Sequence, residues 1–144
     1  MTAFRRITDT FSVAPQLGPE DIARAAGEGF RTLIVNRPDG ESPDAMPIAE
    51  ARALAEAAGL AFAAIPFSGP PTPEAVDQTA TALAAHPAPI LAYCRSGTRS
   101  CTVWALATAK AGRMEAADIL SAASAAGYDL SAMAGTLDRI RREA

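Results

Sequence analysis

The sequence predicts one α/β domain built around a parallel sheet. Between residues 11 and 93, short apolar runs of strand length alternate with longer stretches in which apolar residues recur at helical spacing. Glycine or proline stands at almost every boundary between them, where turns and helix ends are expected. The 144 residues, 49% hydrophobic and 20% charged, have the composition of one globular domain. Because strands that alternate with helices usually pair in parallel, we expect a parallel sheet in a single domain spanning residues 1–144.

The first part of the chain is expected to form two strands and two helices in alternation. Residues 11–13 are a short extended segment, and a helix follows at 19–29, where a proline suits the first turn and a glycine suits a left-handed cap. The apolar run at 32–35 predicts a buried strand. A second helix is expected at 47–59, again opened by proline and closed by glycine.

The same cycle then repeats and is followed only by helices. The run at 60–65 predicts a strand, and the helix after it begins at Thr72, whose hydroxyl can cap the first turn, and ends near His86. The apolar run at 89–93 predicts a third buried strand. Apolar residues at helical spacing then predict three helices, which lie at 103–106, 114–126 and 130–140.

Charge and composition exclude several classes of function. Thirteen basic and 16 acidic side chains give a formal net charge of −3, so no broad basic surface for nucleic acid is expected. No apolar run approaches the roughly 18 residues of a membrane-spanning helix. Residues 1–6 lack the apolar core of a secretory signal, so we expect a cytoplasmic protein with free thiols. One histidine and two cysteines seven residues apart match no zinc pattern, and neither a metal nor another cofactor is expected.

The segment after the third apolar run carries the chemistry. It reads Cys94-Arg95-Ser96-Gly97-Thr98-Arg99-Ser100. Successive backbone N–H groups and the start of a helix concentrate positive potential there, which favours a bound anion and favours a thiolate over a thiol. Cys94 is therefore predicted to be a nucleophile, with Arg99 offering two parallel donors to an oxyanion and Gly97 allowing the tight turn.

The other residues of this segment have both a functional and a structural interpretation. Arg95 can meet a second charge of the substrate or be a surface residue. The hydroxyls of Ser96, Thr98 and Ser100 can donate to the anion or to the sulfur, and Ser100 can instead cap the next helix. Cys101 is interpreted as a small buried helix residue, with a role as resolving thiol as the alternative.

Two groups of enzymes resemble this segment. The pattern Cys-x-x-Gly-x-Arg, with Arg99 five positions after Cys94, resembles the active-site loop of rhodanese-type sulfurtransferases. Protein tyrosine and dual-specificity phosphatases place the arginine one position later and usually have histidine before the cysteine, where this chain has Tyr93.

The rest of the chain resembles the core of a dual-specificity phosphatase. The resemblance rests on the strand at 11–13, the stretch at 29–35, Ile65-Pro66 and the all-helical tail. It implies a three-layer sandwich in which a mostly parallel sheet is covered by helices on both faces.

Three segments together closely resemble one bacterial family, the phosphatase-like domain of the beta-lactamase hydrolase-like proteins. The segments are 11–16, 36–41 and 94–100. The resemblance covers nearly the whole chain and implies Cys94 as nucleophile and Arg99 as anion clamp. It also implies that Asn36, Arg37 and Asp39 line the same cleft. Members are described as phosphatases and some relatives as sulfurtransferases, so the family leaves the reaction open.

The first interpretation is a phosphatase that acts on a small anionic substrate. Cys94 would attack phosphorus, water would later hydrolyse the phosphocysteine, and the leaving oxygen would need a general acid. Phosphatases with this core usually supply an aspartate after Ile-Pro, but residues 67–71 contain no carboxylate. Asp39 is the best substitute, because it follows a parallel strand and should lie at the same sheet edge as Cys94. The alternative is a solvated turn residue.

The second interpretation is transfer of sulfane sulfur. Cys94 would take sulfur from a donor such as thiosulfate or glutathione persulfide and pass it to an acceptor thiol. No oxygen leaving group needs a proton in that reaction, which suits the short loop and the missing carboxylate. A third interpretation is a module that binds an anion or a persulfide without turnover. No pattern in the sequence determines an oligomeric state.

Overall fold

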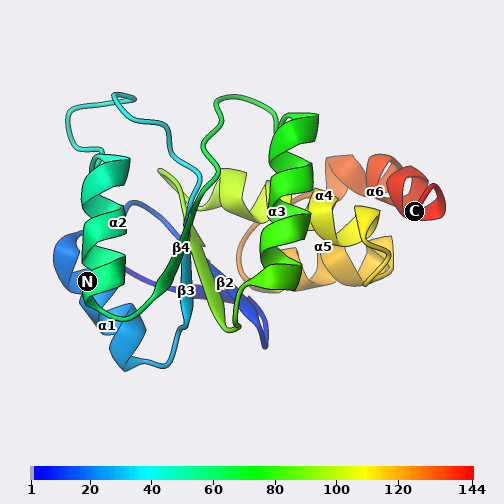
Figure 1. Cartoon of the computed structure of the whole chain (residues 1–144). Coiled ribbons are helices and arrows are strands. Elements are labelled where there is room, and N and C mark those ends of the chain that lie inside the picture. The colour runs from blue at the N-terminus through cyan, green and yellow to red at the C-terminus, as the bar shows by residue number, and fades with distance from the viewer. Residues whose placement is uncertain (1) are drawn as a thin grey trace.

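The chain folds around a five-stranded sheet (Figure 1). This computed structural model describes residues 2–144. Its strands are β1 (Arg5–Thr8), β2 (Phe11–Ala14), β3 (Thr32–Val35), β4 (Ala61–Ala64) and β5 (Ile90–Tyr93). They lie in the order β1-β2-β5-β3-β4. β1 pairs antiparallel with β2 and every other pairing is parallel, which confirms the mostly parallel sheet.

Helices cover both faces of the sheet, so the three-layer sandwich is confirmed. One face is covered by α1 (Pro19–Gly27) and α2 (Ile48–Ala57) (Figure 1). The other carries α3 (Pro73–Ala85), α4 (Thr98–Lys110) and two helices that pack on α4, namely α5 (Ala116–Ala125) and α6 (Ala134–Arg142). A 3₁₀ turn, η1 (Ser131–Met133), precedes α6. Within residues 2–144, no helix has both the length and the apolar character needed to cross a bilayer.

Each face of the sheet buries its own apolar cluster, because successive side chains of a strand point to opposite faces. Leu33 of β3 and Leu91 of β5 pack in the cluster beneath α1 and α2. Ile34 of β3 packs in the cluster beneath α3 and α4, where Phe11 of β2 stacks on Trp104 with ring centroids 5.8 Å apart. Burying each large side chain contributes about 1.5–3 kcal/mol to the stability of the fold. Because β3 and β5 bury side chains on both faces, they contribute to the packing of both helical layers.

Local sequence determines the helix ends as expected. The Thr72 hydroxyl caps α3 by accepting a hydrogen bond from the Ala75 N–H at 3.1 Å, and Pro73 occupies the first turn. Gly29 and Gly59 follow α1 and α2 with φ angles of 98° and 83°, the left-handed conformation that ends a helix.

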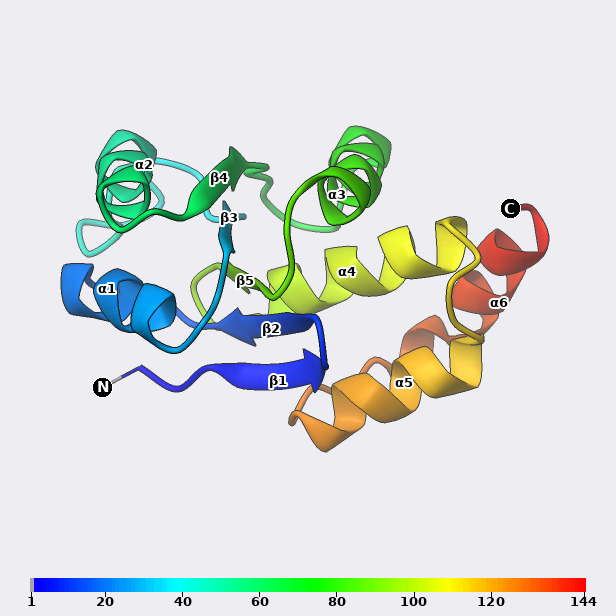
Figure 2. The same ribbon diagram turned by 60° about the horizontal axis from the view of Figure 1, so that its bottom comes forward.

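Two features differ from the expectation. β1 was not predicted, because Ile7 is the one buried residue of a strand that carries two arginines. It lies along the outer edge of β2 and contacts α5 (Figure 2). The continuous helix expected at 130–140 is instead η1 followed by α6. The Met133 N–H donates to the Leu130 carbonyl at 2.8 Å, a tighter turn than an α-helix makes.

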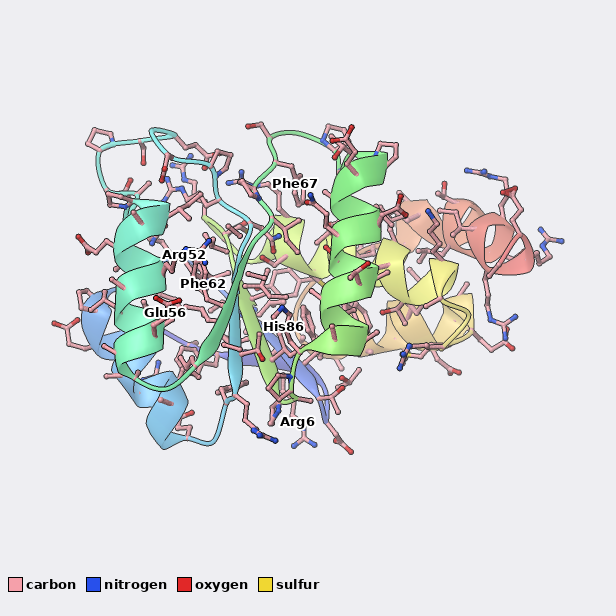
Figure 3. The ribbon with its side chains drawn as sticks, in the orientation of Figure 1. Arg6, Arg52, Glu56, Phe62, Phe67 and His86 are labelled. Carbon is pink, nitrogen blue, oxygen red and sulfur yellow. The ribbon has the colours of Figure 1, made fainter. Side chains whose placement is uncertain are left out.

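The carboxyl ends of the parallel strands meet at one edge of the sheet, where ligands usually bind in such folds. Backbone hydrogen bonds join the loops that begin there. The Cys94 N–H donates to the Ala14 carbonyl (3.3 Å), the Asn36 N–H to the Tyr93 carbonyl (2.9 Å), and the Phe67 N–H to the Asn36 carbonyl (3.2 Å). Phe67 is labelled on the loop that leaves β4 in Figure 3. The loops after β2, β3, β4 and β5 therefore form one continuous rim.

Candidate active site

The loop after β5 turns sharply and directs a backbone amide at the Cys94 sulfur. Gly97 has a φ of 94°, which glycine adopts without strain, and its N–H donates to Cys94 Sγ at 3.1 Å. α4 begins at the next residue, so the loop leads directly into the positive end of a helix. The Cys94 side chain is fully buried beneath this loop.

Arg99, in the first turn of α4, is held by two neighbouring loops. Its Nη1 and Nη2 donate to the two carboxylate oxygens of Glu41 at 2.7 and 2.6 Å, and Nη1 also donates to the Phe67 carbonyl at 3.1 Å. These bonds use three of the five guanidinium N–H groups. The other two, on Nε and Nη2, form the adjacent edge, which can bind two oxygens of a tetrahedral anion.

The charge of Arg99 is stabilised from two sides. Hydrogen bonds to Glu41 raise the pKa of Arg99 above its ordinary value, burial opposes this effect, and the neighbouring Cys94 raises the pKa further. The guanidinium is therefore charged at neutral pH and lies close to the sulfur.

Glu41 is the carboxylate at the centre of this site, and the sequence did not single it out. Hydrogen bonds from Arg99 hold the pKa of Glu41 below its ordinary value, with burial opposing and Arg37 adding to the effect. Arg37 is almost fully buried and its Nε donates to Glu41 at 2.9 Å, while its other nitrogens donate to Gln16 at 3.0 Å and to Ser42 at 2.6 Å. Arg37, expected to line the cleft, thus braces the carboxylate that holds Arg99. The sequence signal for Glu41 was its position four residues after Arg37, in a turn that follows a strand.

Asn36 and Asp39, which were expected to line the same cleft, both make structural contacts. Asn36 is buried and its Nδ2 donates to the Ile65 carbonyl at 2.9 Å, which joins the ends of β3 and β4. Asp39 Oδ1 accepts from the Ile48 N–H at 2.7 Å and so caps α2. Burial raises the pKa of Tyr93 to about 12, and the charge of Asp39 adds to this effect. These contacts agree with the structural interpretation of Asp39, and its role as proton donor stays a prediction.

The other predicted residues of the loop differ in exposure. Arg95, Ser96 and Thr98 are exposed, and the hydroxyls of the latter two lie 3.1 Å apart in a hydrogen bond. Ser100 is fully buried, and its hydroxyl has no hydrogen-bond partner among the described residues, so it is available to a sulfur or a bound anion. Cys101 is buried, and burial raises its pKa to about 12. It therefore remains a thiol at neutral pH, in agreement with its interpretation as a packing residue.

The fold defines the class of protein. A mostly parallel sheet between two helical layers is the architecture of the protein tyrosine and dual-specificity phosphatases. The crystal structure of nma1982, a candidate phosphatase of Neisseria meningitidis, has a TM-score of 0.81 and 29% sequence identity, covering 95% of this chain and 97% of that chain. A kinase associated phosphatase, crystallised with its catalytic site cysteine replaced by serine, shares the fold with a TM-score of 0.70 at 13% identity, covering 99% and 94%.

Sequence comparison identifies the family within this class. A family model described as the phosphatase-like domain of beta-lactamase hydrolase-like protein matches residues 3–111. The beta-lactamase hydrolase-like protein of Agrobacterium fabrum is 33% identical over 135 residues, which are 93% of this chain and 31% of that protein. Its counterpart in Xylella fastidiosa strain 9a5c is 31% identical over 134 residues, 92% of this chain and 31% of that protein. The chain belongs to this family, and it spans about a third of the length of these relatives.

Proposed function

We propose that residues 1–144 form one catalytic domain, a cysteine-dependent phosphatase that hydrolyses a small phosphate ester. The observation that carries the proposal is the meeting of three groups: the Cys94 sulfur, the Gly97 N–H directed at it, and the Arg99 guanidinium beside it. A phosphoryl group needs such donors for its oxygens and a nucleophile in line with the leaving group. Membership of a phosphatase-like family supports the same reaction.

The reaction has two steps. The Cys94 sulfur attacks phosphorus, so that an S–P bond forms as the bond to the leaving oxygen breaks. The loop amides and the remaining edge of Arg99 hold the other phosphoryl oxygens. Water then attacks phosphorus, which breaks the S–P bond, releases phosphate and regenerates Cys94. The buried hydroxyl of Ser100 can donate a hydrogen bond to the departing sulfur.

The source of the proton for the leaving oxygen limits the choice of substrate. Glu41 is a poor donor, because Arg99 lowers its pKa and keeps it ionised at neutral pH. The loop at 67–71 has no carboxylate, so Asp39 is the proposed donor for alcohol leaving groups. Aryl phosphates with acidic phenols need no donor and are expected to be hydrolysed fastest.

Hydrolysis of para-nitrophenyl phosphate tests the proposal. The wild-type protein is expected to release the phenol, and Cys94→Ser to lower kcat by roughly 1,000-fold or more. Cys101→Ala, which removes the other buried thiol, is the matched control and keeps kcat. An acid-quenched reaction should carry an adduct of about 80 Da on Cys94. Turnover that survives Cys94→Ser would refute the mechanism.

Sulfur transfer is the second candidate function, supported by the short spacing from Cys94 to Arg99 and by the carboxylate-free segment at 67–71. With thiosulfate as donor, the thiolate would take the outer sulfur as sulfite leaves, and the persulfide would pass that sulfur to an acceptor. Incubation with thiosulfate or glutathione persulfide would then give an adduct of about 32 Da on Cys94. Phosphate or thiosulfate binding with neither turnover nor an adduct would instead identify a non-catalytic binder.

A further inference from the structure

Tyr128 lies in the turn between α5 and η1, outside residues 3–111, which match the family model. It contacts the loop at 94–100 that follows β5. Its side chain is buried and its hydroxyl donates to the Ser96 carbonyl at 3.2 Å. Burial raises the pKa of Tyr128 above its ordinary value, with Arg5 opposing, so the hydroxyl keeps its proton at neutral pH.

The carbonyl that Tyr128 holds and the amide that faces the sulfur belong to one peptide group. In a planar trans peptide the C=O of Ser96 and the N–H of Gly97 point in opposite directions. The N–H donates to Cys94 Sγ at 3.1 Å while the hydroxyl of Tyr128 holds the opposite end. Rotation of this peptide would turn the carbonyl oxygen, which carries partial negative charge, toward the sulfur and toward any bound anion. The hydrogen bond from Tyr128 opposes that rotation.

The surroundings of Tyr128 fix its position. A Cβ atom on residue 97 would collide with the Tyr128 hydroxyl oxygen, so glycine is required for the close approach. On the other side, the Arg5 guanidinium lies over the tyrosine ring, 5.5 Å from its centroid, and donates to the Ala126 carbonyl at 3.1 Å. The tyrosine is therefore held between β1 and the loop after β5.

We propose that Tyr128 is a positioning residue for anion binding, which holds the Ser96–Gly97 peptide with its N–H directed into the site. The inference rests on the proposed function in one respect, that this loop binds the phosphoryl group of the substrate. The C-terminal helical region thus supplies a hydrogen bond to the loop that residues 94–100 do not supply themselves.

Tyr128→Phe tests the proposal, because it removes one oxygen atom and keeps the ring against Gly97 and Arg5. The KM for para-nitrophenyl phosphate and the inhibition constant of inorganic phosphate are both expected to rise about fivefold to tenfold, the effect of one lost hydrogen bond. Tyr93→Phe is the matched control. It removes a buried hydroxyl that has no partner among the described residues, and both constants should stay within about twofold.

The two constants separate a positioning role from a merely structural one. Partial unfolding lowers the number of active molecules and hence the maximal rate, but leaves KM and the inhibition constant unchanged. A loss confined to the maximal rate, unchanged constants in Tyr128→Phe, or an equal rise in Tyr93→Phe would each overturn the proposal.

A second measurement separates this proposal from the proposed reaction. Inorganic phosphate should protect Cys94 from alkylation by iodoacetamide, and the half-protecting concentration should rise in Tyr128→Phe by the same factor. If the wild-type protein is protected but hydrolyses no phosphate ester, the phosphatase proposal fails and the role of Tyr128 stands. If phosphate gives the wild-type protein no protection, the role of Tyr128 fails.

Discussion

At the scale of single residues, one carboxylate positions the two arginines of the site. Glu41 accepts hydrogen bonds from both Arg37 and Arg99, so one carboxylate fixes two guanidinium groups. The side chains of Arg99 and Glu41 are 19% and 25% exposed, so solvent screens their ion pair. The pair therefore contributes more to the orientation of Arg99 than to the stability of the fold.

Glu41→Gln tests this orientation. Glutamine offers one acceptor oxygen in place of two, so Arg99 loses one of its bonds to this side chain. We expect kcat/KM for para-nitrophenyl phosphate to fall about tenfold. The free energy of unfolding should fall by about 1–3 kcal/mol, because the buried Arg37 guanidinium loses its charged partner as well. Steady-state kinetics and urea unfolding measure the two quantities. Glu56→Gln, on the exposed side of α2, is the control, and an equal fall in both variants would contradict the expectation.

Asp21 makes the stability of α1 depend on pH. Burial raises its pKa, but hydrogen bonds from the N–H groups of Gly18, at 2.8 Å, and Thr2 outweigh burial, so the pKa lies below its ordinary value. The stabilisation is complete above the unfolded-state pKa, near ~4, and is lost as pH falls through the lower folded-state value.

The pH dependence can be measured with Asp21→Asn. The substitution should lower the free energy of unfolding by about 1 kcal/mol at neutral pH and by much less near pH ~2, where the wild-type carboxyl is protonated as well. Urea unfolding at the two pH values gives the difference between the proteins. A difference that does not change with pH would show that the charge of Asp21 has no part in the cap.

At the scale of elements, the junction between β5 and α4 carries the strictest constraint. A buried strand ends, a cysteine follows, and a helix begins after a glycine in the left-handed conformation. Gly97→Ala should therefore cost stability through backbone strain of about 1–3 kcal/mol. It should also weaken phosphate binding by at least about fivefold to tenfold, because the added Cβ collides with the Tyr128 hydroxyl.

Gly59→Ala is the matched control for Gly97→Ala. Gly59 also has a positive φ, 83°, but a Cβ there meets open space and the residue lies after α2. We expect Gly59→Ala to lose comparable stability and to keep the inhibition constant of phosphate within about twofold. Thermal unfolding and inhibition kinetics distinguish the two effects. Normal phosphate binding in Gly97→Ala would show that the loop tolerates a displaced Tyr128.

At the scale of the whole molecule, the helical tail and the sheet share one core. Leu137 of α6 and Ile119 of α5 are fully buried in the same cluster as Ile34 of β3. The tail also brings Tyr128 to the loop after β5. The phosphatase-like site and the tail are therefore expected to unfold together.

Leu137→Ala tests this coupling. Truncation of a fully buried leucine is expected to lower the free energy of unfolding by about 2–5 kcal/mol, and Leu137→Met by less than about 1.5 kcal/mol. Urea unfolding followed by Trp104 fluorescence and by hydrolysis of para-nitrophenyl phosphate should give one shared transition. Loss of hydrolysis at a urea concentration where Trp104 remains packed would show that the site opens independently of the core.

The sequence predicted most of the fold because most of its signals are local. The apolar run at 32–35 and the Thr72 cap reappear at the expected positions. β1 escaped notice because a strand with one buried side chain has no apolar pattern, and its place is determined by pairing with β2. Of the predicted site residues, some have the surroundings that the local sequence indicated, and others make contacts that depend on the tertiary structure. Cys94 and Arg99 lie together, whereas Asn36 and Arg37 form buried hydrogen bonds that support the site.

The sequence by itself determined the order of the helices and strands apart from β1, and it placed a cysteine and an arginine on a turn between a strand and a helix. Periodicity, capping and turn chemistry act over a few residues and can be recognised in the chain. Only the tertiary structure decided which carboxylate and which tyrosine meet that turn. Glu41 lies 58 positions from Arg99, and Tyr128 lies 32 positions from Ser96. Contacts over such separations depend on strand order and helix packing. No local pattern in the sequence indicates which distant segments these will bring together.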